Sequence, residues 1–102
     1  MARYAIVTLK YVAPLERILL TTDRHRAYLR ELHAQGKLVM SGPFEPRTGG
    51  ALLLRASSEA EIRQLLAADP FHQEALVEST VQMWAVNIGD AGLDLLAPAQ
   101  KA

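Results

Sequence analysis

The chain has no cysteine, few aromatic residues and no excess of charge of either sign. The absence of cysteine excludes disulfides, thiol chemistry and zinc sites built on cysteine. The 11 basic residues balance the 11 acidic ones and form no basic stripe, so no nucleic-acid partner is expected. No long apolar run follows the N-terminal residues, and we therefore expect no signal peptide, no membrane span and a cytoplasmic location.

What is present is the composition of a small globular domain. Half of the 102 residues are hydrophobic. A chain of this size buries roughly 65% of its unfolded surface, which is enough for one core. We expect one domain over residues 1–90 and a C-terminal tail over residues 91–102, in which the leucine-rich run Leu93–Ala97 is compatible with a short helix.

The periodicity of apolar residues predicts strands alternating with helices. The expected strands are Tyr4–Tyr11, Leu38–Ser41, Ala51–Ala56 and Val81–Ile88. The first helix is expected to begin at a cap on Thr22 or Asp23 and to end at Gln35, before Gly36. Pro14–Leu20 then forms a connector with room for one helical turn.

The second helix has boundary signals at both ends. Ser58 and Glu61 form a capping box, which predicts the start of a helix. Asp69 before Pro70 predicts its end, because the residue before proline avoids helical backbone. Phe71–Val77 is expected to add one further helical segment.

The order β-α-β-β-α-β is typical of a ferredoxin-like sandwich, an α+β fold in which an antiparallel four-stranded sheet carries two helices on one face. Gly42-Pro43 is expected to end the second strand, and Thr48-Gly49-Gly50 to form the turn before the third. Met83 and Trp84 are expected in the core or on the open face of the sheet. That face would be apolar and exposed, which predicts a homodimer packed sheet on sheet.

Two polar residues stand on the apolar stripes of the expected helices. His25 shares its stripe with Leu29 and Leu32, and Asp69 ends the stripe of the second helix. A buried carboxylate is costly without a partner, and the expected topology brings the start of the first helix and the end of the second to one edge. We therefore expect a His25–Asp69 pair, in which the carboxylate orients the imidazole and makes it a better general base.

The same edge is expected to supply the walls of a substrate site. The residues assigned to substrate binding are Tyr11, Arg24, Ser41, Gly42, Pro43 and Phe71. Ser41 and the backbone of Gly42 would bind a substrate oxygen, since glycine lets a ligand approach closely. Arg24 is placed on one basic side of the first helix with Arg26 and Arg30, a pattern more typical of a solvated face than of an anion site.

The remaining histidines, His33 and His72, are interpreted as surface residues. No carboxylates at ligand spacing accompany the histidines, so neither a metal nor an organic cofactor is expected. The His25–Asp69 pair itself has a structural alternative, in which it only joins two helix ends.

A spaced set of short segments gives the chain a family resemblance. The segments are His25–Leu29, Leu32, Gly36–Leu38, Ser41–Pro43, Gly49–Gly50 and Asp69–Phe71. Together they resemble the YciI-like (YCII-related) family over about residues 3–88. The resemblance implies a dimeric α+β fold whose sheets pack across the dimer, and an active site on a His–Asp pair, here His25 and Asp69, with Ser41 in the pocket. Related domains include a dehydrochlorinase that acts on a ring substrate.

The chain departs from the family's usual pattern at three positions. Thr22 stands where many relatives carry arginine, Ala75 where many carry glycine, and Met83 where many carry proline. With Thr22 in place of the arginine, Arg24 is the candidate for binding an anion beside the pair.

These observations predict a small cytoplasmic enzyme, active without a cofactor, that uses His25 and Asp69 for general acid–base chemistry. The expected reaction is an elimination or isomerisation of a small cyclic or carboxylated substrate. Two alternatives stay open: a non-catalytic module that binds a small ligand in the same cleft, and a purely structural pair.

Overall fold

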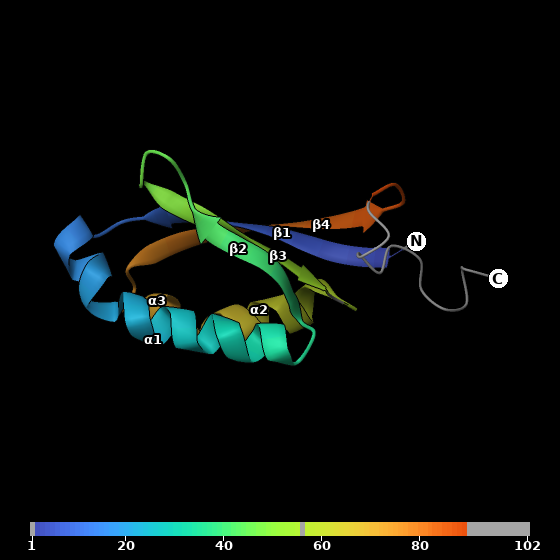
Figure 1. The fold of residues 1–102 in the computed structure, drawn as a ribbon, viewed down its shortest axis with the longest axis horizontal. Helices are drawn as coiled ribbons and strands as arrows, with labels where there is room; N and C mark the ends of the chain where they lie inside the picture. The colour runs from blue at the N-terminus through green and yellow to red at the C-terminus, as the bar shows by residue number, and fades with distance from the viewer. Residues whose placement is uncertain (1, 56, 90–102) are drawn as a thin grey trace.

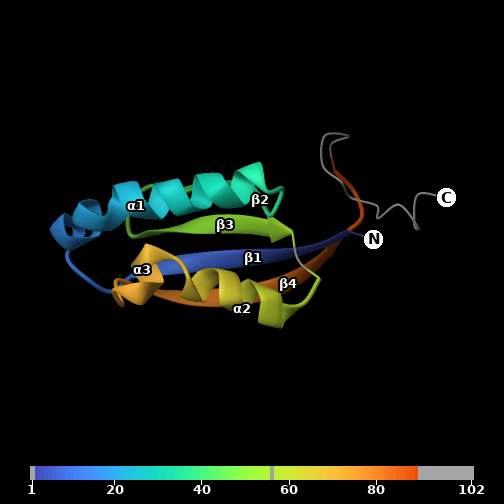
Figure 2. The same ribbon diagram turned by 90° about the horizontal axis from the view of Figure 1, so that it is seen from below.

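The computed structural model describes residues 2–55 and 57–89. An antiparallel four-stranded sheet, in the order β2-β3-β1-β4, is covered on one face by a layer of helices (Figures 1 and 2). The elements are β1 (Ala2–Tyr11), α1 (Leu15–Ala34), β2 (Leu38–Pro43), β3 (Gly49–Arg55), α2 (Glu59–Ala67), α3 (Pro70–Gln73) and β4 (Val77–Val86). The predicted ferredoxin-like α+β fold is confirmed. The predictions for Ala56 and for residues 91–102, including the short helix, lie outside the described residues.

The core lies between the sheet and the helices. Successive side chains of a strand point to opposite faces, and in β1 the residues Ala5, Val7 and Leu9 face the helices and are buried. Apolar side chains at helical spacing pack against them from the helices: Ile18, Leu29 and Leu32 of α1, and Ile62 and Leu66 of α2. This packing fixes which side of α1 faces the sheet, and with it the direction of His25.

Helix α1 begins at Leu15, and the cap predicted at Thr22 or Asp23 is wrong. The hydroxyl of Thr22 donates a hydrogen bond of 2.8 Å to the carbonyl of Ile18, one turn back, and so does not compete with the helix. Fully buried Ile18 anchors the added turns, which the pattern of Pro14–Leu20 did not reveal. As a result His25 lies about three turns inside the helix rather than one.

The end of α1 is as predicted. Gly36 has φ +76°, a left-handed conformation that glycine adopts without a Cβ penalty. The Lys37 amide donates to the Leu32 carbonyl at 2.8 Å, and the Gly36 amide donates to the His33 carbonyl at 3.0 Å. These two bonds satisfy carbonyls that the helix leaves free.

Helix α2 begins at the predicted cap, where the Ser58 hydroxyl accepts a hydrogen bond of 3.2 Å from the Glu61 amide. The Glu61 carboxylate accepts a bond from the Ser57 hydroxyl at 2.6 Å rather than reaching back to the cap residue. The helix ends before Asp69, as predicted. The segment that follows is shorter than expected, because only Pro70–Gln73 is helical and β4 already begins at Val77.

Gly49 and Gly50 were predicted in a turn but belong to β3. Gly42 and Pro43 were predicted to end the second strand and are the last two residues of β2. A Cβ on Gly49 would lie 1.8 Å from the Leu9 carbonyl oxygen, and one on Gly50 would lie 2.7 Å from that of Gly42. These glycines are therefore required by close approach of neighbouring strands. They draw β1, β2 and β3 together at the edge that carries the site.

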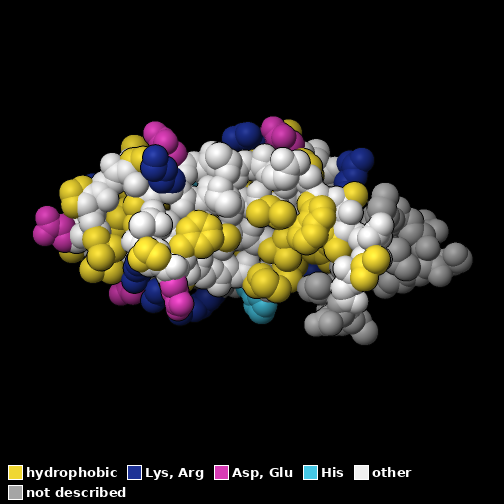
Figure 3. Space-filling view, turned by 90° about the horizontal axis from the view of Figure 1, so that it is seen from above, with side chains coloured by type: hydrophobic (Ala, Val, Ile, Leu, Met, Phe, Trp, Pro, Cys, Tyr) yellow, Lys and Arg dark blue, Asp and Glu magenta, His cyan; other side chains and the backbone are white. Residues whose placement is uncertain are grey.

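The sheet face opposite the helices is open, and apolar side chains gather on it (Figure 3). Trp84 is 46% exposed and Met40 is 58% exposed. Met83 points to the opposite side of β4 and packs against the core. Of the two locations predicted for this pair, Met83 therefore takes the core and Trp84 takes the open face. No helix in the described parts of the chain is long and apolar enough to cross a membrane.

Candidate functional site

His25 and Asp69 meet where α1 passes the junction of α2 and α3. The Nδ1 atom of His25 lies 2.6 Å from Oδ1 of Asp69, and the two residues are 8% and 2% exposed. Asp69 has extended backbone, as Pro70 demands, and this directs its side chain back toward α1. The structure thus brings together the two residues that the sequence assigned to catalysis.

The second oxygen of Asp69 is also occupied, by a histidine interpreted as a surface residue. Nδ1 of His72 lies 2.7 Å from Oδ2, and its side chain is only 15% exposed. Asp69 caps α3 and His72 is the third helical residue, a position from which side chains reach back to a cap. The Asp-x-x-His spacing was the sequence signal for this contact.

The electrostatics of Asp69 are dominated by burial and by the two rings. Burial alone raises the pKa of the Asp69 carboxyl, but the hydrogen bonds from His25 and His72, with their charges, outweigh it and leave that pKa below its usual range. Asp69 is therefore an ionised acceptor near neutral pH. Each histidine accordingly donates through Nδ1–H, which leaves Nε2 without a hydrogen whenever the ring is neutral.

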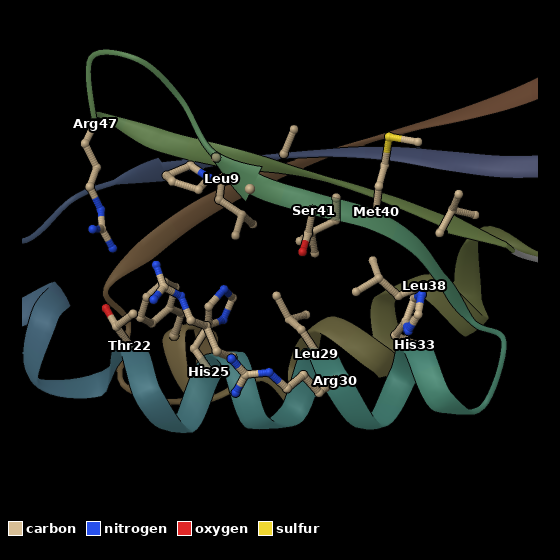
Figure 4. A pocket seen from close by; sticks show the side chains of 18 of the residues that line it. Leu9, Thr22, His25, Leu29, Arg30, His33, Leu38, Met40, Ser41 and Arg47 are labelled. Carbon is tan, nitrogen blue, oxygen red and sulfur yellow. The ribbon is translucent and has the colours of Figure 1, made fainter.

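The ring of His25 is held by a stacking contact on its face, in addition to the hydrogen bond from its Nδ1 edge to Asp69. It stacks on Phe71 with ring centroids 3.8 Å apart and an interplanar angle of 6°. Phe71 in turn meets Tyr11 edge to face at 6.3 Å. With Nδ1 fixed by Asp69, the other edge of the His25 ring is directed to a cavity between α1 and β2 (Figure 4).

The cavity has a volume of about 520 Å³, within the range of small-molecule sites. It is lined by five of the six residues assigned to substrate binding, namely Tyr11, Ser41, Gly42, Pro43 and Phe71. Ser41 points from β2 toward α1, across the cavity from His25 and Leu29 (Figure 4). A ligand here would lie between an imidazole and a hydroxyl group.

Arg24 does not line the cavity. It forms an ion pair with Glu74, which also accepts a hydrogen bond of 3.0 Å from Thr21 and lies 3.6 Å from a guanidinium nitrogen of Arg17. The hydrogen bond from Thr21, then that from Arg24, lowers the pKa of Glu74. At 100° per residue Arg24 and Arg26 point in opposite directions, so the single basic side predicted for α1 does not exist.

Three arginines that the sequence did not assign to the site line the cavity: Arg26, Arg30 and Arg47. Nε of Arg47 donates a hydrogen bond of 3.3 Å to the Tyr11 hydroxyl. Arg26 and Arg30 could have been found from their spacing of four residues, which puts them on one face. Arg47 comes from the loop between β2 and β3, whose path the sequence pattern did not predict.

His33 is exposed, as expected, and stands at the end of the cavity away from Arg47 (Figure 4). Within residues 2–55 and 57–89, no three His, Cys, Asp or Glu side chains are placed to hold a metal ion. The polar side chains that line the cavity are therefore two imidazoles, hydroxyls and guanidinium groups.

The fold and this site define a class of protein. The model of the YCII-related domain matches residues 2–84, and the chain belongs to that family. Among its relatives is the uncharacterized protein YjpA of Bacillus subtilis (strain 168), which is 37% identical over 60 residues, covering 59% of this chain and 71% of YjpA.

A solved structure shares the fold. It is the 5-chloro-2-hydroxyhydroquinone dehydrochlorinase TftG from Burkholderia phenoliruptrix AC1100, in complex with 2,5-dihydroxybenzoquinone. The TM-score is 0.70 and the sequence identity is 24%, with 83% of this chain and 95% of that chain covered.

Proposed function

We propose that the protein is a cofactor-independent enzyme that uses the His25–Asp69 pair for general acid–base catalysis, an elimination or isomerisation of a small cyclic or carboxylated compound. The observation that carries this proposal is the orientation of His25, whose Nδ1 is tied to a buried carboxylate while the ring borders a cavity. This arrangement leaves the second ring nitrogen, Nε2, for a molecule that enters the cavity.

The proposed chemistry begins when neutral His25 takes a proton from a ring carbon of the substrate through Nε2. Asp69 holds the ring and stabilises the imidazolium that forms. The Ser41 hydroxyl and the backbone of Gly42 bind a substrate oxygen. In an elimination the electron pair left on carbon expels a leaving group, and in an isomerisation His25 returns the proton at another atom.

The comparison with TftG supports an elimination. Its name describes a dehydrochlorinase, and its structure holds a ring-shaped ligand on the same fold. In the keto tautomer of a chlorinated hydroquinone, the carbon next to the C–Cl carbon carries an acidic hydrogen. A base that removes this hydrogen lets the electron pair expel chloride and form the quinone, which is the role proposed for His25.

The runner-up is a non-catalytic module that binds a small ligand in the same cavity. It accounts for the cavity, but it gives no reason for a buried carboxylate that holds Nδ1–H of His25 and so leaves Nε2 unprotonated.

We also propose that the open sheet face pairs with a second copy of the chain, in which case Trp84 and Met40 would be covered. A cytoplasmic location stays a prediction.

The test compares the native protein with His25→Gln on 5-chloro-2-hydroxyhydroquinone, with chloride release as the readout. We expect the variant to remain folded and to lose about 10²–10⁴-fold in rate, the usual contribution of general acid–base catalysis. A His25→Gln protein with native activity would contradict the proposal. Binding of 2,5-dihydroxybenzoquinone without conversion of the chlorinated compound would favour the binding module.

A further inference from the structure

The arginines of the chain fall into two groups. All five that lie outside the cavity have partners: Arg17 and Arg24 pair with Glu74, Arg63 pairs with Glu59, Arg3 donates to the Ser57 carbonyl, and Arg55 donates to the Gly36 carbonyl. The three that line the cavity have no carboxylate partner among residues 2–55 and 57–89. The arginines outside the cavity are thus engaged by carboxylates or backbone carbonyls, whereas those of the cavity have no carboxylate to balance their charge.

The cavity wall itself carries no negative charge, since no Asp or Glu is among the residues that line it. Asp69 contacts His25, a residue of the cavity wall, but it does not line the cavity itself. Its carboxylate is already hydrogen-bonded to two histidines. A cavity lined by charge of one sign with apolar walls concentrates counter-ions of the opposite sign. Because the whole chain has no net charge, this excess is local.

The cationic groups come from two elements that border the cavity, α1 and the loop after β2. Arg26 and Arg30 are one turn apart on α1, on the same side of the helix as the cavity. Arg47 descends from the loop after β2, with its guanidinium group directed toward α1 (Figure 4). Its contact with the Tyr11 hydroxyl uses Nε only, so the terminal nitrogens remain for a ligand.

Between these cations the surface is apolar. Leu9, Leu29, Leu38 and Leu52 line the cavity and face the space between the sheet and α1. A flat hydrocarbon ring fits such a surface, whereas an inorganic ion would leave it unfilled. Guanidinium groups match carboxylates in shape and charge, because two parallel N–H groups can bind both oxygens.

We infer that the ligand of this cavity is a ring-sized organic carboxylate, whose charge is balanced by Arg30 of α1 and Arg47 of the loop after β2 while its ring lies against the leucines. The inference deepens the proposed function, since it names the charge and shape of the substrate at the same site. The arginines would also stabilise negative charge that develops on the ring as His25 removes a proton.

The experiment uses benzoate and benzamide as probes, because they share a ring and differ in charge. Binding is followed by NMR through the Nε–Hε signals of the arginines and the backbone amides around the cavity, at millimolar probe. We expect benzoate to bind at least about fivefold more tightly than benzamide, with a preference that decreases as salt is added.

Variants assign the effect to the cavity. Arg30→Ala and Arg47→Ala should each weaken benzoate binding about five- to tenfold, the loss of one charge-assisted contact in a partly open site. Arg17→Ala is the matched control, because Arg17 lies on the same helix, outside the cavity, beside Glu74. It should bind benzoate as the native protein does.

Equal binding of the two probes, no binding of benzoate, or equal losses in Arg17→Ala and Arg30→Ala would overturn the inference. The proposed function fails separately. His25→Gln should keep its preference for benzoate and lose chloride release, so an active His25→Gln protein that prefers benzoate would contradict the catalytic role alone.

Discussion

Two carboxylates join the short helix α3 to α1, and they do so in different ways. Asp69 precedes α3 and binds two histidines, whereas Glu74 follows it and binds Thr21 and the permanently charged Arg24. Asp69 is 2% exposed, but a quarter of the Glu74 side chain is open to water. Glu74 thus acts as a clamp at the surface, while Asp69 places its charge in the interior, between two histidine rings.

The difference also bears on where we propose that a ligand binds. Arg17 and Arg24 share the Glu74 carboxylate, and both lie outside the cavity. His25 turns its other nitrogen to the cavity, which is also lined by arginines that have no carboxylate partner in the described part of the chain. Arginines of α1 that contact Glu74 therefore serve the fold, whereas Arg26 and Arg30 of the same helix have no carboxylate partner among the described residues and remain available to a ligand.

The largest expected effect on stability comes from Asp69→Asn. The amide has one oxygen to accept from two Nδ1–H groups, so one buried donor loses its partner. We expect the free energy of unfolding to fall by about 1–3 kcal/mol, measured by urea denaturation near neutral pH.

Glu74→Gln is the matched variant at the other end of α3. Water can replace the lost contacts there, so its loss of stability should be smaller and should vanish as salt is added. Equal losses in the two variants would remove the distinction between the clamp and the site.

The smaller effect is the dependence of stability on pH. The pKa of Asp69 is lower in the folded protein than its ordinary value of 3.8. Its ionised form therefore stabilises the fold at pH values above 3.8, and this contribution is lost as the pH falls through the folded pKa.

Unfolding curves of native protein and Asp69→Asn between pH 6 and pH 2 measure this contribution. The native curve should fall more steeply below about pH 4, and the two should converge in acid. Glu74, whose pKa is also lowered, contributes to both curves and so cancels in their difference. Parallel curves would show that Asp69 gains no stabilisation from its histidines.

Much of the site was predictable from the sequence because it depends on periodicity and topology. His25 and Asp69 stood on apolar stripes, which predicted that both side chains face the sheet. The expected start of α1 was wrong, however, so His25 meets Asp69 from within the helix rather than from its end. Ser41 and Tyr11 followed from the direction of the strands. These predictions required no knowledge of side-chain rotamers.

The predictions that failed concern residues whose hydrogen bonds have local alternatives, or residues whose position is set by a loop or a very short helix. Thr22 looked like a cap, but its hydroxyl bonds within the helix, so α1 begins seven residues earlier, at Leu15. His72 required the geometry of a helix that is only four residues long. Arg47 reaches the cavity from a loop whose path no periodic pattern describes.

The most direct test of the central claim is the position of the hydrogen on the neutral ring of His25, read from its ¹⁵N NMR shifts. The account predicts a hydrogen on Nδ1 and a bare Nε2 in the native protein, and loss of that preference in Asp69→Asn. A native ring that carries its hydrogen on Nε2 would place no base in the cavity and would contradict the account.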